Sequence, residues 1–344
     1  MTVRDIAAAA GVHFTTVSLA LRNSPRLNAE TRRRLQLKAE QMGYTPDPMV
    51  SALIAYRSEL RTPRFQAVLA WINNWPRRED LLRIPSFQGY YQGACERARQ
   101  LGYMIEEIWL HDSGTTPDKL PRVLRAQGIQ GLLMAPQPTS RMWPGIEFEP
   151  FSAVSFGYSM QPAVLNVVTN HHYHTMAMMF SRLVELGYER IGLFMPEDWD
   201  AKVENHWTAG WLIASQKYAG KVVALPAYVD PPEDYPRLRK WFNKHRPDVV
   251  IGRVEEIAAV EALGFSVPGD VGFAGLDLHT DEVRYSGTYQ NSVLIGQKAV
   301  DILIGMIHRD ERGVPATPVR TLVESTWVPG TTLRAQRATP TAAS

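Results

Sequence analysis

Short apolar runs alternate with segments of helical periodicity over most of the chain, starting near Gln66. The clearest runs are residues 68–72, 131–134 and 248–251. A strand that is buried on both faces reads as a continuous apolar run. Strand–helix–strand repeats form parallel sheets with right-handed crossovers. The alternation therefore predicts an α/β core with doubly wound parallel sheets.

The first sixty residues have a different pattern, in which short helices are separated by glycine. Thr2 and Asp5 have the spacing of a capping box at the start of a helix. Gly11 can take a positive φ and end this helix, after which residues 14–21 resume with one apolar face. Asn28 is placed to cap a third helix. Two short helices joined by a tight glycine turn predict an all-α helix-turn-helix domain.

Positive charge is concentrated in the same segment. Residues 1–64 hold ten Lys and Arg against five Asp and Glu, whereas the remainder holds 27 against 30. A positive field over one small module attracts a polyanion, and a helix-turn-helix places its second helix in the major groove of double-stranded DNA. The predicted DNA-binding residues of these helices and turns are Thr2, His13, Phe14, Thr15, Thr16, Ser18, Leu19, Arg22, Asn28, Thr31 and Arg32.

Five short motifs in this segment resemble those of a known family in order and spacing. They are Val-Arg-Asp-Ile-Ala at 3–7, Ala-Gly-Val at 10–12, Thr-Val-Ser at 16–18, Thr-Arg at 31–32 and Gly-Tyr-Thr-Pro at 43–46. The family is the lactose/galactose repressor (LacI/GalR) family of bacterial transcription regulators, and the resemblance extends over residues 2–333. It implies a two-lobed core similar to a periplasmic sugar-binding protein. It also implies a homodimeric repressor that binds a pseudo-palindromic operator and a small-molecule effector, expected to be a carbohydrate.

The resemblance further implies a hinge helix that inserts a leucine into the minor groove. Asp47 can cap such a helix, Pro48 fits its first position, and Leu53 matches the inserted leucine. The alternative for Leu53 is packing on its own domain. Two positions depart from the family pattern, since Leu19 replaces the usual arginine and Arg22 the usual asparagine. Leucine offers a base only apolar contact, so the family's usual operator sequence is not expected.

These patterns divide the chain into four parts. The expected parts are a helix-turn-helix domain at 1–46, a hinge helix and linker at 47–64, an effector-binding core at 65–334 and a flexible tail at 335–344. Within the core, the resemblance implies an N-lobe of about residues 65–164 and 292–323, and a C-lobe of about residues 165–291 and 324–334.

Candidates for the effector site follow the predicted strands, because doubly wound folds bind ligands beyond the carboxyl ends of their strands. On the resemblance, Asp277 matches an aspartate that contacts the effector, and a carboxylate accepts hydrogen bonds from neighbouring hydroxyls. Trp207 replaces a common cleft arginine and offers a stacking surface instead. Arg253 either compensates for that arginine or pairs at the rim, and Gln290 either faces the cleft or holds a crossover. The predicted effector-binding set is Asn74, Trp75, Tyr90, Gln137, Trp207, Arg253, Asp277 and Gln290.

Other chemistries lack their sequence signatures. His171, His172 and His174 suggest a metal site, but neighbouring histidines point in different directions and no carboxylate or cysteine is placed to complete it. We therefore predict no metal and no cofactor. The chain has no Gly-x-Ser-x-Gly elbow, no Walker loop and no Gly-x-Gly-x-x-Gly opening the first core helix, so no enzyme activity is predicted.

Two non-enzymatic alternatives remain, a solute-binding receptor and an architectural DNA binder. The first would need a signal peptide where the helix-turn-helix stands, and the second would not need so large a core. The single cysteine, Cys95, excludes an intrachain disulfide and fits a reducing compartment. No segment approaches about 18 uncharged apolar residues. We therefore expect a cytoplasmic protein without membrane contact.

Overall fold

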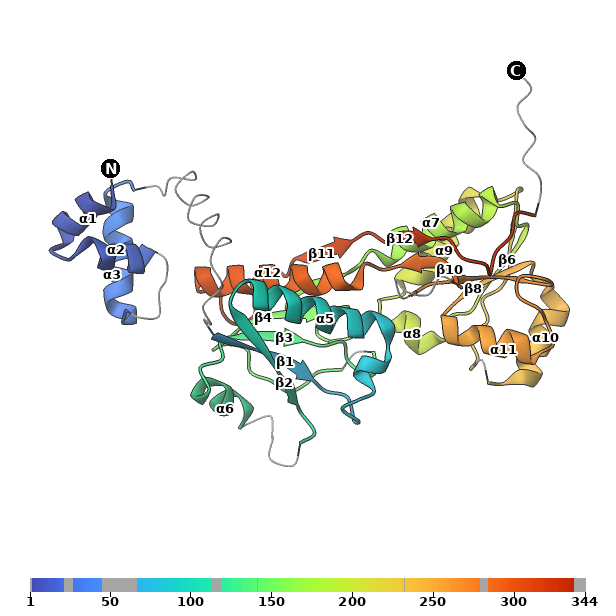
Figure 1. Cartoon of the computed structure of the whole chain (residues 1–344), viewed down its shortest axis with the longest axis horizontal. Coiled ribbons are helices and arrows are strands. Elements are labelled where there is room, and N and C mark those ends of the chain that lie inside the picture. The colour runs from blue at the N-terminus through green and yellow to red at the C-terminus, as the bar shows by residue number, and fades with distance from the viewer. Residues whose placement is uncertain are drawn as a thin grey trace, which may run out of the picture.

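The computed structural model describes residues 2–21, 27–44, 67–112, 119–140, 142–231, 233–278 and 284–336. Within these ranges it contains a helical N-terminal domain and an α/β core of two lobes, arranged along the long axis of the molecule (Figure 1). Three predicted features lie outside the described residues: the hinge helix with Leu53, the DNA contact Arg22, and residues 337–344 of the tail.

The N-terminal domain consists of α1 (Val3–Ala10), α2 (Phe14–Leu21) and α3 (Ala29–Gln41). The expected capping box is present: Thr2 N donates to Asp5 Oδ2 at 2.7 Å, and Asp5 N donates to Thr2 Oγ1 at 3.4 Å. Gly11 ends α1 with a φ of 66°, which side chains disfavour. The small core that joins the three helices contains Ile6, Ala7, Val17, Ala20, Leu35 and Ala39.

The first lobe is built on a parallel sheet with the strand order β11-β5-β4-β3-β1-β2. Its strands are β1 (Ala67–Asn73), β2 (Tyr103–Trp109), β3 (Gly131–Met134), β4 (Ser152–Phe156), β5 (Asn166–Asn170) and β11 (Arg320–Val323). Its helices are η1 (Leu81–Arg83), α5 (Pro85–Gln100), α6 (Leu120–Ala126) and α12 (Ser292–Arg309). Alternate residues of β1 enter two different cores: Trp71 packs with α5 and α12, and Ile72 packs with α6. Both faces of the sheet are therefore covered.

The second lobe has a sheet with the order β12-β10-β9-β8-β6-β7, parallel except for the β10–β12 pair. Its strands are β6 (Arg190–Leu193), β7 (Val223–Ala224), β8 (Val249–Gly252), β9 (Gly272–Gly275), β10 (Ser286–Tyr289) and β12 (Thr326–Val328). Its helices are α7 (His172–Glu185), α8 (Glu197–Ala201), α9 (His206–Lys217), α10 (Tyr235–His245), η2 (Val254–Glu256) and α11 (Ile257–Ala262). One apolar core lies under α7 and α9, and another under α10 and α11. The predicted doubly wound architecture is confirmed in both lobes.

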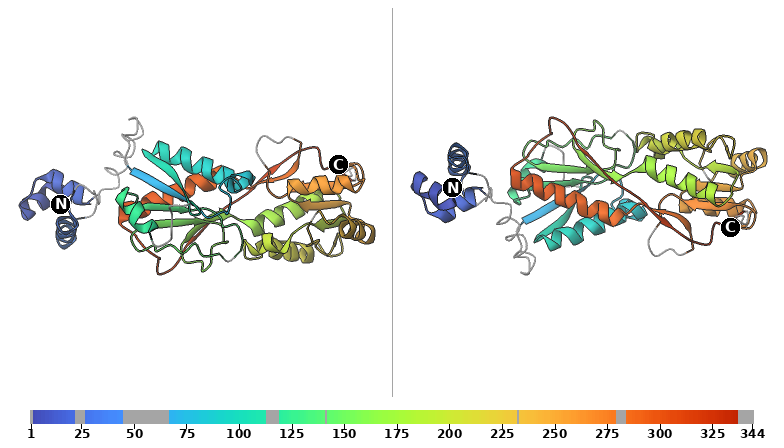
Figure 2. Two further views of the ribbon diagram at one scale, coloured as in Figure 1. Left: turned by 90° about the horizontal axis from the view of Figure 1, so that it is seen from below. Right: turned by 90° about the horizontal axis from the view of Figure 1, so that it is seen from above.

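Three segments connect the lobes, between β5 and α7, between β10 and α12, and between β11 and β12 (Figure 2). The expected lobe boundary near residue 164 needs correction. β5 pairs with β4 and β11 of the first sheet, so the chain leaves the first lobe after Asn170. This strand is short and carries asparagine at both ends, which weakened its apolar signal in the sequence.

Helices α5 and α12 pack with their backbones nearly in contact. A Cβ added at Gly93 would overlap the carbonyl oxygen of Val293, and one added at Gly296 would overlap that of Tyr90. Glycine at both positions removes these overlaps and lets the helices approach closely. This packing fixes the first turn of α5, which forms one wall of the cleft described below.

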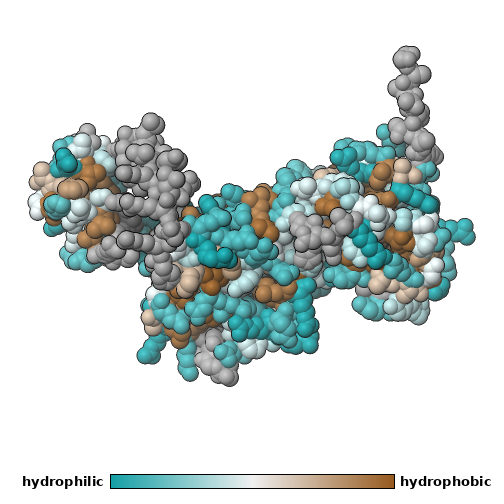
Figure 3. All heavy atoms as spheres, viewed as in Figure 1, coloured by the Kyte–Doolittle hydropathy of each residue, from teal (hydrophilic) through white to brown (hydrophobic). Residues whose placement is uncertain are grey.

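The surface is mixed in character. On the face shown in Figure 3, hydrophilic side chains predominate over both lobes and hydrophobic ones form small separate patches. Among the helices of the described ranges, none is both long enough and apolar enough to cross a membrane.

Candidate functional site

The N-terminal end of α2 presents aromatic and polar side chains to solvent. Phe14 is 43% exposed, and His13 and Thr15 are also exposed. His13 Nδ1 lies 2.8 Å from Thr15 Oγ1, and the His13 ring centroid lies 4.5 Å from that of Phe14. The Arg4 guanidinium from α1 lies 5.8 Å from the Phe14 ring. The start of the second helix is thus accessible, as binding in a DNA groove requires.

The remaining predicted DNA contacts that the structure describes lie on α2, on α3 and at the N-caps of α1 and α3. Thr2 and Asn28 are exposed and cap α1 and α3, while Thr16, Ser18, Leu19, Thr31 and Arg32 are half-buried. Asn28 Oδ1 accepts a hydrogen bond from Thr31 N at 2.7 Å. Arg32 Nη2 lies 3.9 Å from Asp310 Oδ2 at the end of α12, so this cation faces the core in the present arrangement.

A cleft of about 950 Å³, partly open to solvent, lies between the two lobes. The first lobe contributes the start of α5 and the residues that follow β3 and β4. The second lobe contributes residues that follow β6, β8, β9 and β10, together with the start of α9. The cleft therefore lies at the carboxyl ends of the parallel strands, where doubly wound folds bind ligands.

Five of the predicted effector-binding residues line this cleft: Tyr90, Trp207, Arg253, Asp277 and Gln290. Tyr90 is almost fully buried, and its ring stacks on that of Phe156 with centroids 5.2 Å apart. Burial raises the pKa of the Tyr90 hydroxyl, which keeps it protonated. Gln290 Nε2 donates to Leu276 O at 3.3 Å, so this amide holds the end of β9 as well as lining the cleft.

The other three predicted residues, Asn74, Trp75 and Gln137, are not among the residues that line the cleft. Asn74 Nδ2 donates to Gln137 Oε1 at 2.9 Å, and the buried Gln137 donates to Ala135 O at 2.8 Å. Trp75 Nε1 donates to Pro136 O at 2.8 Å. These hydrogen bonds join the residues that follow β1 to the residues that follow β3. They also provide hydrogen-bond partners for buried polar atoms.

Several residues that line the cleft were not predicted from the sequence, above all Trp199 and Lys202. Both come from α8 and the residue after it, between β6 and α9. Lys202 Nζ lies 4.8 Å from the Trp199 ring centroid and 5.5 Å from that of Trp75. The Arg253 guanidinium lies 4.5 Å from the Trp199 ring. The rule that ligands bind beyond the carboxyl ends of parallel strands located Asp277 after β9. Applied to the carboxyl end of β6, the same rule would have pointed to this segment.

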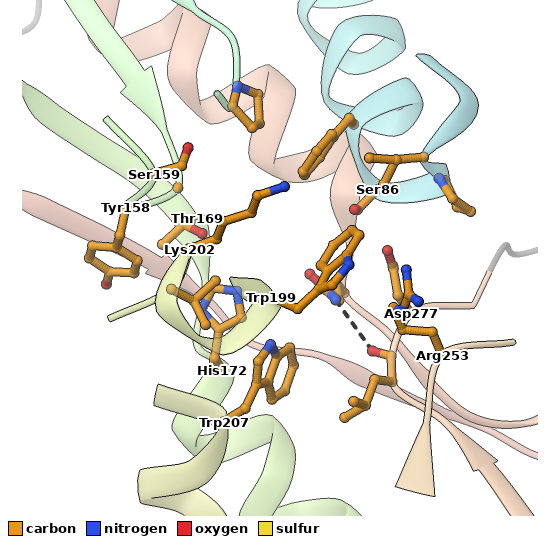
Figure 4. Close-up of a pocket in the computed structure, with 18 of the residues that line it drawn as sticks. Ser86, Tyr158, Ser159, Thr169, His172, Trp199, Lys202, Trp207, Arg253 and Asp277 are labelled. Atoms are coloured by element: carbon orange, nitrogen blue, oxygen red, sulfur yellow. Dashed lines mark hydrogen bonds between the residues drawn. The ribbon is translucent and has the colours of Figure 1, made fainter. Parts of the chain in front are cut away.

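His172 was predicted only as one of a histidine group, yet it lines the cleft. Its ring lies 4.7 Å from that of Trp207, edge to face, and Figure 4 shows both side chains at the same wall. Burial lowers the pKa of His172 to about 3, so the imidazole is neutral near pH 7. Its Nδ1 is buried and has no hydrogen-bond partner in the described part of the chain.

A buried carboxyl group stands behind Arg253. Glu256 is 1% exposed and accepts hydrogen bonds from Arg253 N at 2.9 Å and from Arg253 Nε at 3.1 Å. Burial raises the pKa of Glu256 to about 7, against the opposing effect of Arg253. The Arg253 guanidinium thus both pairs with Glu256 and faces the cleft, which combines the two alternatives expected from the sequence.

A carboxylate does lie beside the histidine group, contrary to the expectation from the sequence. His171, His174 and Glu324 each offer a ligand atom, and these atoms lie within 4.8 Å of one another. His174 Nδ1 lies 3.0 Å from Glu324 Oε1, and the rings of His171 and His174 stack with centroids 3.8 Å apart. The sequence did not reveal this carboxylate, because Glu324 is far from the histidines along the chain. It comes close to them only through the segment that crosses between the lobes from β11 to β12. His174 and Glu324 are both exposed, and the contact between them is that of a surface hydrogen-bonded pair.

Two family models match the chain. Residues 2–47 match the model described as bacterial regulatory proteins, lacI family, and residues 180–333 match the periplasmic binding protein-like domain. Among characterised relatives, the HTH-type transcriptional repressor PurR of Haemophilus influenzae (strain PittEE) is 20% identical over 333 residues, which cover 90% of this chain and 92% of PurR.

Solved structures share the fold over nearly the whole chain. A transcriptional regulator CelR–cellobiose complex is 19% identical with a TM-score of 0.54 and covers 96% of this chain and 99% of its own. The lac repressor dimer bound to operator and the anti-inducer ONPF is 18% identical with a TM-score of 0.56 and covers 97% and 99%. At such identities these structures establish the fold of the two modules and nothing beyond it.

Proposed function

Because the chain belongs to the lacI family of bacterial regulatory proteins, and is therefore a DNA-binding transcription regulator rather than an enzyme, we propose that it is an effector-controlled repressor. In this proposal a homodimer binds a pseudo-palindromic operator, and a sugar or sugar derivative binds between the lobes of each core. One observation carries the proposal. The same chain joins a helix-turn-helix with an accessible second helix to a cleft whose walls come from two separate lobes.

DNA recognition is assigned to the exposed start of α2. Phe14, Thr15, Ser18 and Leu19 lie off the buried face of this helix, so in a major groove they would face base edges and phosphates. Phe14 and Leu19 offer apolar contacts, which suit thymine methyl groups. We therefore expect a half-site whose sequence differs from one read by arginine at the Leu19 position.

Effector control is assigned to the crossing segments, because a ligand that contacts both lobes alters their relative position. Asn170 Nδ2 donates to Ser325 Oγ at 2.7 Å, and Asn291 Nδ2 donates to Glu324 O at 2.7 Å. All three crossing segments are thus tied together by hydrogen bonds, and a change in lobe closure is shared among them. The effector shifts DNA affinity only by the difference in its own affinity for the two closures.

A sugar is proposed as effector from the character of the cleft. The Trp207 ring offers an apolar face, while Asp277, Thr169 and Ser159 offer acceptors and donors for hydroxyl groups. Carbohydrates combine these two surfaces. The cellobiose complex of the CelR regulator, which has the same fold, supports this choice.

The test combines operator selection with ligand binding. The full chain would be used to select DNA from a random library, and its affinity for the selected site would then be measured by fluorescence anisotropy with and without sugars. We expect a palindromic site and a change in DNA affinity of at least about fivefold with one ligand. Ligand binding without any selected DNA sequence would instead identify a solute-binding receptor.

A further inference from the structure

Two cations lie beside one tryptophan in the cleft. Lys202 Nζ and the Arg253 guanidinium are 4.8 Å and 4.5 Å from the Trp199 ring centroid, respectively. Figure 4 shows them on either side of the indole, with Lys202 extending toward the wall that carries Ser86. Burial lowers the pKa of Lys202, Asp198 opposes this effect, and the repulsion from Arg253 lowers the pKa a little further.

Lys202 has one counter-charge, a long ion pair with the carboxylate of Asp198. The residue is only 8% exposed, and the nearest carboxylate oxygen, Asp198 Oδ2, is 3.9 Å away, beyond hydrogen-bond distance. The Asp198 side chain is itself 56% exposed. No other described residue accepts a hydrogen bond from Lys202 Nζ. A buried ammonium is costly unless it is paired, so this group favours an incoming anion.

Arg253 contributes a second positive group with donors to spare. Its Nε is bound to Glu256, whereas its two Nη groups make no hydrogen bond to the residues of the described ranges. Glu256 neutralises Arg253 only partly near pH 7, because burial raises the pKa of this carboxyl group to about 7. Lys202 and Arg253 thus place two positive groups beside Trp199, while the carboxylates of Glu255 and Asp277 also line the cleft.

The first turn of α5 adds to the positive potential. This helix of 16 residues begins without a side-chain cap, and its first helical hydrogen bond runs from Gln88 N to Ile84 O. Ile84, Pro85, Ser86 and Phe87 all line the cleft. The N-terminus of a helix favours an anion, and the Ser86 hydroxyl can donate to one.

We propose that the effector is an acidic carbohydrate, such as a uronic or aldonic acid or an oligosaccharide that contains one. Its carboxylate pairs with Lys202 Nζ and accepts from Ser86 Oγ, while Arg253 adds attraction from the other side of Trp199. Asp277 and Trp207 then meet the neutral part of the sugar, its hydroxyls and its apolar face. Trp207 stands where the family resemblance led us to expect an arginine. Lys202, from a different element, thereby supplies the positive charge that this arginine would have provided. The inference rests on the proposed function only in taking this cleft as the effector site.

The test compares acids with their neutral counterparts. Binding to the full chain would be measured by calorimetry for glucuronate, galacturonate, gluconate and cellobionate, each against glucose, galactose or cellobiose. We expect at least one acid to bind about 10- to 100-fold more tightly than its neutral partner, the effect of one charge-assisted hydrogen bond. This preference should shrink as salt is added and as the pH rises through the pKa of Lys202, because the ammonium is then lost.

Matched lysine variants assign the preference to one side chain. Lys202→Met should reduce the preference for the acid to within about threefold, and Lys202→Arg should retain part of it. Lys217→Met serves as the control, since Lys217 also lies over an aromatic ring, at 5.4 Å from Tyr218, but is exposed at the end of α9. Lys202→Met removes a buried charge, so the variant is expected to fold. Operator affinity equal to that of the wild type would verify that it does.

Three results would overturn the inference. They are a neutral sugar that binds as tightly as its acid, an acid preference that survives Lys202→Met, and failure of every acid to bind a protein that still binds its operator. The last result would leave the DNA-binding function intact. Loss of specific DNA binding by the wild-type chain would instead count against the proposed function, whatever ligand the cleft takes.

Discussion

Replacing His172 by phenylalanine is expected to change how the stability of the core depends on pH. His172 is buried against Trp207, and its pKa is lowered from 6.5 to about 3. Between these values the unfolded chain binds a proton that the folded chain excludes, so His172 makes the folded state less stable as the pH falls. The stability is fully present above pH 6.5 and is lost progressively below it. Phenylalanine keeps an aromatic ring at this position and removes the group that binds the proton.

The expected magnitude follows from the two pKa values. Between pH 7.5 and pH 5, a pKa of 6.5 in the unfolded chain and about 3 in the folded core gives a loss of about 2 kcal/mol. At pH 7.5 the variant should be at least as stable as the wild type, since His172 Nδ1 is buried without a hydrogen-bond partner in the described ranges.

Urea denaturation followed by tryptophan fluorescence measures this effect, because all nine tryptophans lie within residues 65–334. The quantity of interest is the difference in unfolding free energy between wild type and variant at each pH, in which Glu256 and other titrating groups cancel. His111→Gln is a matched control, since His111 is exposed. If the difference between wild type and His172→Phe stays constant within about 0.5 kcal/mol from pH 7.5 to pH 5, the buried neutral imidazole is refuted.

Three further predictions test other parts of the molecule. Leu53→Ala should lower operator affinity by roughly tenfold or more while leaving ligand affinity unchanged, in a paired anisotropy and calorimetry measurement; equal operator affinity would remove this leucine from the minor groove. Asp277→Ala should abolish the response of DNA binding to effector in a protein with an unchanged melting temperature, and a normal response would place the effector elsewhere. Gly93→Ala should destabilise the first lobe by about 1–3 kcal/mol in chemical denaturation, because its Cβ would overlap Val293 O. Gly305→Ala, in the same helix pair but next to the flexible Arg309 side chain, should be neutral or stabilising, so equal effects of the two substitutions would contradict the close packing of α5 and α12.

The sequence alone determined the elements of the N-terminal domain and the class of the core. The capping box of Thr2 and Asp5, the turn at Gly11 and the Asn28 cap are local features, in which the interacting residues lie within a few positions of one another. The apolar runs that form β1, β3 and β8 are local features as well. A strand that is buried on both faces consists almost entirely of apolar residues, so its own sequence is enough to predict it. These local patterns therefore sufficed for the helical domain and for the class of the core, but not for the lobe boundary after β5.

Only the tertiary structure decided which side chains share the cleft. Asn74 and Gln137 stood at the ends of strands, as the rule for doubly wound folds requires, yet they bind each other. Lys202 and Trp199 come from a short helix with no period of its own and meet Arg253, some fifty positions further along the chain. Likewise, Glu324 reaches His174 through a crossing segment. Such meetings depend on strand order and on how closely helices pack, and these are set by contacts between distant residues that no local pattern records.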